Sequence, residues 1–308
     1  MALDNYGLSN SWGACGAFKG PGGSWVQLYD PASPKTDPKY AADVLDWTRR
    51  ATSAIHEVGM LVIPNFSEYA FSDDVLAVAN ATDGFLAEGG FTIWNPIPNT
   101  TSATVPPPFT TPTDFADKVL FIRNLQRAGK GFFAINEWGA GPDYGLNPGG
   151  QPYNITGPEH RAIRQFVVAS FMLVNGESCG IYLTCIQCYG GHAGGIGNLS
   201  IWPEYAAKVG HPVQKEPFND LASGVWSRQY SGGIAIVNPE ATAQRFTLPS
   251  PPSNYVDLYG NPVTANPLTI PPATGLVLLQ PPKGALDTEL QKVSTRSRGG
   301  GFKVDPAH

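Results

Sequence analysis

Short apolar runs alternate with amphipathic segments along the first two-thirds of the chain. The runs cover residues 1–4, 60–65, 84–88, 131–137 and 180–184. In each run successive positions are apolar, and each run ends in polar or glycine-rich sequence. This pattern is typical of strands that are buried on both faces of a parallel sheet. It therefore predicts five parallel strands.

The segments between these runs carry apolar residues at helical spacing. In the first segment, Asp37 predicts an N-cap, Pro38 the first helical residue and Gly59 the end of the helix. Its predicted apolar face consists of Val44, Trp47, Ala51, Ile55 and Val58. Further helices are predicted over residues 73–78, 113–128, with Thr113 as N-cap, and 163–174. Strands that alternate with helices in this way form a parallel sheet.

The pattern changes near residue 219. Short strands separated by Pro, Asn and Gly turns are predicted at residues 224–230, 233–238, 245–248, 255–258, 267–270 and 275–279. No segment with helical spacing lies between them, which predicts an antiparallel β-sandwich. After residue 280 the chain becomes charged and rich in glycine, so we expect a disordered tail. The predicted divisions are a strand–helix domain over 1–216, a sandwich over 217–280 and a tail over 281–308.

Composition narrows the classes of partner. Charged residues make up 15% of the chain and the formal net charge is −5, without a basic stripe, so a nucleic acid is not an expected partner. No apolar run approaches the roughly 20 residues of a membrane span, so no membrane segment is expected. A neutral, hydroxyl-rich ligand fits this composition better, and no oligomeric state is predicted.

Sequons and cysteines bear on the compartment. Asn-x-Ser/Thr triplets, each a weak signal alone, occur at Asn65, Asn80, Asn99, Asn154 and Asn198. They favour an extracellular or secretory-pathway protein whose signal peptide precedes this chain. The four cysteines, Cys15, Cys179, Cys185 and Cys188, predict either buried thiols or one disulfide. Because the Cys-x-x-Cys pair has no second pair or histidine pair to complete it, no zinc site is expected, and no cofactor is predicted.

Several short motifs occur in a fixed order along residues 1–280. They read LDN at 3–5, NF at 65–66, AEGG at 87–90, NEWG at 136–139, YLT at 182–184 and GVWSR at 224–228, followed by IAIVN, DLYGNPV and PPATGLVLL. In this combination the chain resembles a family of glycoside hydrolase-like proteins with a (β/α)8 barrel and a C-terminal β-domain. The resemblance implies that residues 1–216 are a partial (β/α)8 TIM barrel and residues 217–280 a small antiparallel β-sandwich.

The register implied by the resemblance makes residues 1–4 strand four of the barrel. A closed barrel of this kind has eight strands, so the first three are expected to be missing. The competing architecture is an open doubly wound sheet, which normally carries a Gly-rich nucleotide loop after its first strand. The stretch from Gly20 to Gly23 is not followed directly by a helix and does not match that loop. The predicted fold class is therefore α/β, with the later strands of a barrel.

Carboxylates at strand ends are the candidates for chemistry. Glycoside hydrolysis needs two carboxyl groups, and functional residues of a (β/α)8 barrel project from the carboxyl ends of its strands. Asp4, Glu88 and Glu137 meet this condition. Asp4 is predicted to be the nucleophile or base, or else a cap, and Glu88 the general acid, or else a loop anchor. Asp83 precedes its strand, so we expect a cap or turn residue at the opposite end.

Glu137 ranks below this pair. It follows Asn136, as the acid/base glutamate does at strand four of many retaining glycosidases, but only one parallel strand follows it before the sandwich. A structural ion pair or a hydrogen bond to the sugar is its alternative role. Further candidates for binding substrate are Asn5, Asn65, Trp94, Asn136, Trp138 and His192. The tryptophans among them suit sugar rings, whose C–H faces stack on aromatic rings.

Two functions follow from these residues. The first is a metal-independent glycoside hydrolase-like protein that cleaves O-glycosidic bonds of a poly- or oligosaccharide through paired carboxylates. The second is a non-catalytic carbohydrate-binding or structural remnant of such an enzyme. The expected loss of strands favours the remnant, whereas the strand-end carboxylates Asp4 and Glu88 favour the enzyme.

Overall fold

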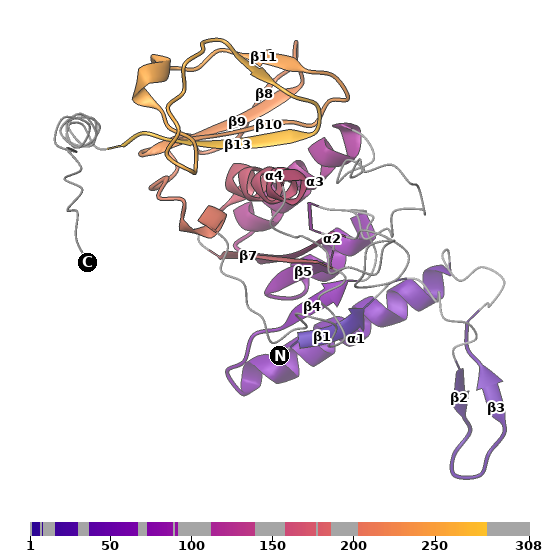
Figure 1. Ribbon diagram of the computed structural model, residues 1–308. Helices are drawn as coiled ribbons and strands as arrows, with labels where there is room; N and C mark the ends of the chain where they lie inside the picture. Colours follow the sequence, from indigo (N-terminus) through magenta and orange to yellow (C-terminus); the bar gives the residue numbers. More distant parts are fainter. Residues whose placement is uncertain are drawn as a thin grey trace, which may run out of the picture.

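A five-stranded sheet forms the first part of the protein in a computed structural model (Figure 1). The structure describes residues 2–6, 8, 16–29, 37–66, 73–88, 90–91, 112–138, 158–176, 178–185 and 203–281. The strands are β1 (Ala2–Tyr6), β4 (Ile63–Phe66), β5 (Gly84–Glu88), β6 (Gly131–Trp138) and β7 (Cys179–Cys185). Every neighbouring pair is parallel. The prediction of five parallel neighbours is therefore confirmed.

The order of these strands is β1-β4-β5-β6-β7, so each lies beside the parallel strand that precedes it in the chain. Consecutive strands of a barrel wall follow one another in this way, whereas the order of a doubly wound sheet reverses at a switch point. Within the described ranges β1 and β7 each pair with one other strand, and the sheet does not close. The protein is thus a mixed α/β protein with a parallel sheet and separate antiparallel sheets.

Four α-helices accompany the sheet in the part of the chain that the structure describes. They are α1 (Pro38–Glu57), α2 (Asp73–Asn80), α3 (Pro112–Arg127) and α4 (Pro158–Val174). The predicted start of α1 is confirmed, because Asp37 Oδ1 accepts hydrogen bonds from the N–H groups of Lys39 and Tyr40 at 2.9 and 3.1 Å. The prediction that Thr113 is the N-cap of α3 is wrong: the helix begins at Pro112, so Thr113 lies inside it.

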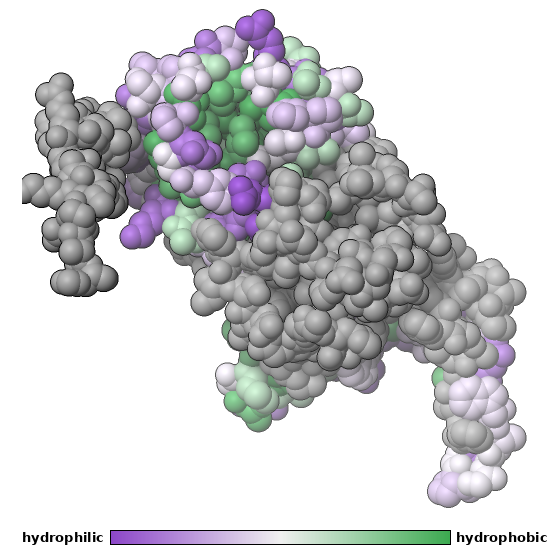
Figure 2. All heavy atoms as spheres, viewed as in Figure 1, coloured by the Kyte–Doolittle hydropathy of each residue, from purple (hydrophilic) through white to green (hydrophobic). Residues whose placement is uncertain are grey.

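The buried face of α1 agrees with the predicted one only in part: Val44 packs against the hydrophobic core, and Ala51 and Ile55 are half-buried. Thr48 and Thr52 are buried, whereas Trp47 is 47% exposed and Val58 is 67% exposed. The Thr48 hydroxyl donates to the Val44 carbonyl at 2.7 Å, so the helix backbone satisfies this buried hydroxyl. Spacing identified the apolar stripe but not which edge of it faces inward. Figure 2 shows the resulting apolar surface at the C-terminal end of α1, where Val58, Met60 and Leu61 are exposed.

The C-terminal part consists of antiparallel sheets, as predicted. One has the order β13-β10-β9-β8, and the other pairs β11 with β12. Their strands are β8 (Phe218–Asp220), β9 (Val225–Tyr230), β10 (Gly233–Asn238), β11 (Gln244–Phe246), β12 (Leu268–Ile270) and β13 (Thr274–Leu279). The run at 255–258 forms single bridges through Val256 instead of a strand. Residues 219–280 contain no α-helix, although Pro252–Asn254 form a 3-10 turn.

A hairpin of β2 (Gly16–Phe18) and β3 (Trp25–Gln27) was not predicted. These strands are three residues long and are separated by a glycine-rich turn. Two such short strands contain too few alternating positions for periodicity to reveal them. In Figure 1 the hairpin lies at one end of α1, away from the five-stranded sheet.

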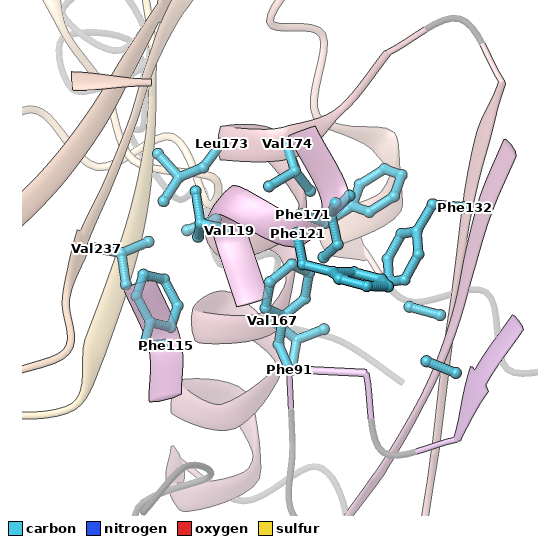
Figure 3. Packing of buried hydrophobic residues seen from close by; sticks show 14 of the residues in the cluster. Phe91, Phe115, Val119, Phe121, Phe132, Val167, Phe171, Leu173, Val174 and Val237 are labelled. Atoms are coloured by element: carbon cyan, nitrogen blue, oxygen red, sulfur yellow. The ribbon is translucent and has the colours of Figure 1, made fainter. Parts of the chain in front are cut away.

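The four-stranded sheet β13-β10-β9-β8 is covered on both faces. On one face, Trp226 and Val237 belong to the same hydrophobic cluster as Phe115 of α3 and Phe166 of α4. Figure 3 shows Val237 beside Phe115 and Leu173 in this cluster. The opposite face contributes to a second cluster, which contains Val225, Ile234, Ile236, Leu248, Tyr255, Ile270 and Leu278. Both faces being buried explains why β10 is apolar at nearly every position.

Close backbone contact joins β13 to α4. A Cβ atom on Gly275 would lie 2.6 Å from Cα of Phe166. This distance is too short for any side chain, so the glycine is required for the sheet to approach the helix. The four-stranded sheet and α4 therefore make direct main-chain contact at Gly275.

An ion pair also links α3 to the segment that precedes β8. The guanidinium of Arg123, which is buried, lies 2.9 Å from Glu216, and that of Arg127 lies 3.1 Å from it. Arg123 Nη2 also donates to the Lys215 carbonyl at 3.0 Å. Residues 215–216 are thus held against the helix by both charge and backbone contacts.

Acid pH is expected to weaken this link. Hydrogen bonds from Arg123 and Arg127 lower the pKa of Glu216 from 4.5 to about 2, in spite of its partial burial. Because the pKa is lower in the folded state, the stabilisation is complete above about pH 4.5 and is lost as the pH falls toward about 2. The Glu216 side chain is 33% exposed, so we expect its contribution to be about 1–2 kcal/mol, less than the full shift implies.

Urea unfolding of the wild type and Glu216→Gln at neutral and acid pH measures this effect. The difference between their free energies of unfolding should shrink as the pH falls through this range. A difference that stays the same at both pH values would show that the ion pair does not contribute to stability.

Candidate functional site

The carboxyl ends of the parallel strands form one edge of the five-stranded sheet, and the backbone positions of the three candidate residues lie at or near it. The prediction that Asp4 ends its strand is wrong: Asp4 is the middle residue of β1, which continues to Tyr6, and it lies at an irregularity of the register between Leu3 and Tyr6. Glu88 ends β5, where it pairs with Ile135 of β6, and Glu137 lies two residues beyond that position and pairs with Thr184. The backbone therefore brings these strand ends to a common edge.

For several candidates the structure describes only the backbone. Asn5 lies in β1 beside Asp4, and Trp138 ends β6 after Glu137. Trp94 and His192 lie outside the described residues. The roles assigned from sequence to these residues, and to the carboxylates themselves, stay predictions.

The Asn136 side chain fixes the chain that follows β5. Asn136 is completely buried, and its Oδ1 accepts a hydrogen bond from the Phe91 N–H at 2.7 Å. Gly90 is compressed against the same amide: a Cβ on Gly90 would lie 2.5 Å from Asn136 Oδ1, and its φ is +43°. Glycine is thus required at this position. The observed role of Asn136 is to hold residues 90–91, and a role in binding substrate stays a prediction.

A lysine on α3 also holds residues 90–91. Lys118 Nζ, on α3, donates to the Gly90 carbonyl at 2.7 Å. Burial of the ammonium group lowers the pKa of Lys118 from 10.5 to about 8, against a smaller opposing effect of Asp114. Phe91 then packs against Phe115 of α3, with 6.3 Å between ring centroids. Residues 90–91, two positions beyond Glu88, are therefore fixed by β6 and α3 together.

Sequence reasoning did not identify Lys118. The signal was present, because Lys118 lies three residues after Phe115 and four before Ile122, on the apolar stripe of α3. A charged residue within such a stripe requires a buried polar partner. Which partner it meets depends on how β5 and α3 are placed in space, which the spacing of residues does not specify.

Asp83 lies at the opposite edge of the sheet, as expected. Its Oδ2 lies 2.8 Å from His56 Nε2 and accepts the Val62 N–H at 2.8 Å. Burial raises the pKa of Asp83, but the hydrogen bonds from His56 and Val62 outweigh it, and the net pKa is lowered. Asp83 thus anchors the turn before β5.

Asn65 lies in β4, and its side chain is buried, with 9% of its surface exposed.

The described residues contain no group of three or more His, Cys, Asp or Glu side chains that could hold a metal ion. Of the cysteines, the thiol of Cys179 is described, and it is not in a disulfide. Gln126 Nε2 donates a hydrogen bond to the Cys179 sulfur, and burial raises the pKa of the Cys179 thiol. Among the helices that the structure describes, none has the length and apolar character needed to cross a membrane.

Comparisons with known proteins add little to this description. No family model matches the chain, and no curated protein matches it. Among solved structures, the chain is similar to the ligand-free form of a cyclic α-maltosyl-(1→6)-maltose hydrolase from Arthrobacter globiformis. The identity is 12% and the TM-score is 0.25, over 87% of this chain and 67% of the other. A likeness at this level carries no argument about function.

Proposed function

We propose that this protein is glycoside hydrolase-like and cleaves O-glycosidic bonds of a poly- or oligosaccharide. The observation that supports the proposal is the order β1-β4-β5-β6-β7 of parallel strands. This order places the carboxyl ends of the strands that contain Asp4, Glu88 and Glu137 at one edge, where (β/α)8 enzymes place their catalytic groups. As part of the proposal, the five strands are the later strands of such a barrel, and the protein acts outside the cell or in the secretory pathway.

Asp4 and Glu88 are the two carboxyl groups assigned to the reaction, and each would take a different role. Glu88 follows an apolar strand, and its neighbours Phe85 and Phe91 are each 1% exposed. An apolar environment favours the protonated form of a carboxyl group, so Glu88 is assigned as general acid. Asp4 is followed by the polar Asn5, which favours the ionised form, so Asp4 is assigned as nucleophile or base. Glu137 is the next candidate for either role.

A glycan panel tests the proposed function. The purified chain is incubated with neutral poly- and oligosaccharides, and new reducing ends are measured against the double variant Asp4→Asn/Glu88→Gln. We expect release by the wild type and none by the variant, because both substitutions keep the size of the side chain and remove its acid–base chemistry. The anomer that is first released then distinguishes retention from inversion.

Two results would count against the enzyme. Release by the double variant at the wild-type rate would remove both carboxylates from the reaction. Binding of a glycan without any cleavage would instead support the non-catalytic remnant.

A further inference from the structure

Three side chains, from β6 and α3, converge on residues 90–91. Asn136 of β6 accepts the Phe91 N–H, Lys118 of α3 donates to the Gly90 carbonyl, and Phe115 of α3 packs on the Phe91 ring. We define these contacts as the rim clamp. The clamp begins two residues after Glu88, so it limits the positions that the end of β5 can adopt.

A clamp of this kind is costly for folding. Burial of the Lys118 ammonium disfavours its charged form, as the pKa of about 8 shows. Gly90 adopts a left-handed conformation against the Asn136 amide. A helix surface could hold an ordinary loop with apolar contacts alone. Polar groups that are buried at such cost are expected where the position of the backbone matters.

We propose that Lys118 is a positioning residue, which holds the segment after β5 and so sets the position of Glu88 at the edge of the sheet. The inference rests on the proposed function for its catalytic consequence, but the clamp itself is a property of the fold. Lys118 acts through the Gly90 carbonyl and does not contact substrate.

The chain offers a matched control for Lys118. Lys130 Nζ donates to the Thr82 carbonyl, which precedes β5, whereas Lys118 Nζ donates to the Gly90 carbonyl, which follows it. Both lysines therefore hydrogen-bond a backbone carbonyl next to the same strand, one at each end. If Lys118 only stabilised the fold, Lys118→Met and Lys130→Met would have similar effects on kcat.

The first measurement is hydrogen–deuterium exchange of the full chain, resolved to the Phe91 amide. We expect Lys118→Met to accelerate this exchange by about tenfold or more, because local opening governs amide exchange, and Lys130→Met to leave it unchanged. Asn136→Ala should accelerate it as well, since the Phe91 N–H loses its acceptor. This second variant keeps the test valid if Lys118→Met does not fold.

The second measurement is turnover of a glycan that the wild type cleaves. Lys118→Met should lower kcat by about tenfold or more with little change in KM, because misplacing a catalytic group slows the reaction step more than binding. Lys130→Met should keep the wild-type kcat. Unchanged exchange at Phe91 in Lys118→Met would overturn the role of Lys118, whatever the result for Asn136→Ala, and unchanged exchange in both variants would overturn the whole clamp. Faster exchange with unchanged kcat would overturn the positioning role. If the wild type cleaves no glycan, the proposed function fails, and exchange alone decides the clamp.

Discussion

Glu88→Gln is expected to lower turnover by roughly 10²–10⁴-fold, which is the usual contribution of a general acid. The glutamine keeps the size of the side chain but cannot supply a proton to the leaving oxygen. Glu137→Gln should lower turnover by less than about tenfold if Glu137 only hydrogen-bonds the sugar, since a neutral amide can replace such a contact. The two variants therefore separate the neighbouring glutamates at the ends of β5 and β6.

The matched control for this prediction is Asp83→Asn. Asp83 precedes β5 and Glu88 ends it, so the two carboxylates lie at opposite ends of one strand. Steady-state kinetics should show wild-type turnover for Asp83→Asn, with some loss of stability because its bonds to His56 and Val62 are weakened. Near-normal turnover in Glu88→Gln together with a large loss in Glu137→Gln would reverse the assignment of the general acid.

Arg228→Met is expected to destabilise the protein by about 3–5 kcal/mol, because it removes a buried guanidinium that donates to the buried Leu173 carbonyl and to several partly buried carbonyls. Arg228 Nη1 donates to the carbonyls of Leu173 and Asn175 at 3.1 and 2.7 Å. These carbonyls belong to the C-terminal end of α4, where the helix cannot satisfy them itself. Nε and Nη2 donate to the carbonyls of Gln214 and Lys215, each at 3.2 Å.

Urea unfolding followed by circular dichroism measures this loss. Arg228→Lys should recover only part of it, because an ammonium group lacks the planar fork that reaches two segments at once. Arg245→Met on β11 is the control: Arg245 is exposed, so we expect a change within about 0.5 kcal/mol. A small effect of Arg228→Met would mean that water or other donors replace the guanidinium.

Periodicity predicted the elements better than their contacts. The strands of the parallel sheet and the ends of α1 followed from apolar runs and from Asp37, Pro38 and Gly59, because these signals are local. The rotation of α1 did not follow, since Trp47 and Thr48 occupy adjacent positions and either could face inward. The choice depends on the neighbouring surface, which local sequence does not encode.

The sequence predicted which carboxylates lie near the carboxyl ends of strands, but not the contacts around them. Glu88 ends β5 as predicted, whereas Asp4 lies inside β1, and the chemistry assigned to both stays a prediction. The contacts of Lys118 and Arg228 join residues that are far apart in the sequence: 28 positions separate Lys118 from Gly90, and 55 separate Arg228 from Leu173. The Trp-x-Arg motif marked Arg228 as part of a pattern, whereas its role as a helix cap required the packing of β9 on α4.

Main-chain packing of β13 on α4 at Gly275 ties the C-terminal sheets to the rest of the protein. Because both faces of the four-stranded sheet are covered, fragments made by cutting the chain near residue 216 would each expose an apolar surface. The C-terminal sheets are consequently not an accessory module that recombination could exchange between proteins. Substitution on α4 is restricted as well, since each new residue on its sheet-facing side must suit partners on β9, β10 and β13, which lie far along the chain from the helix.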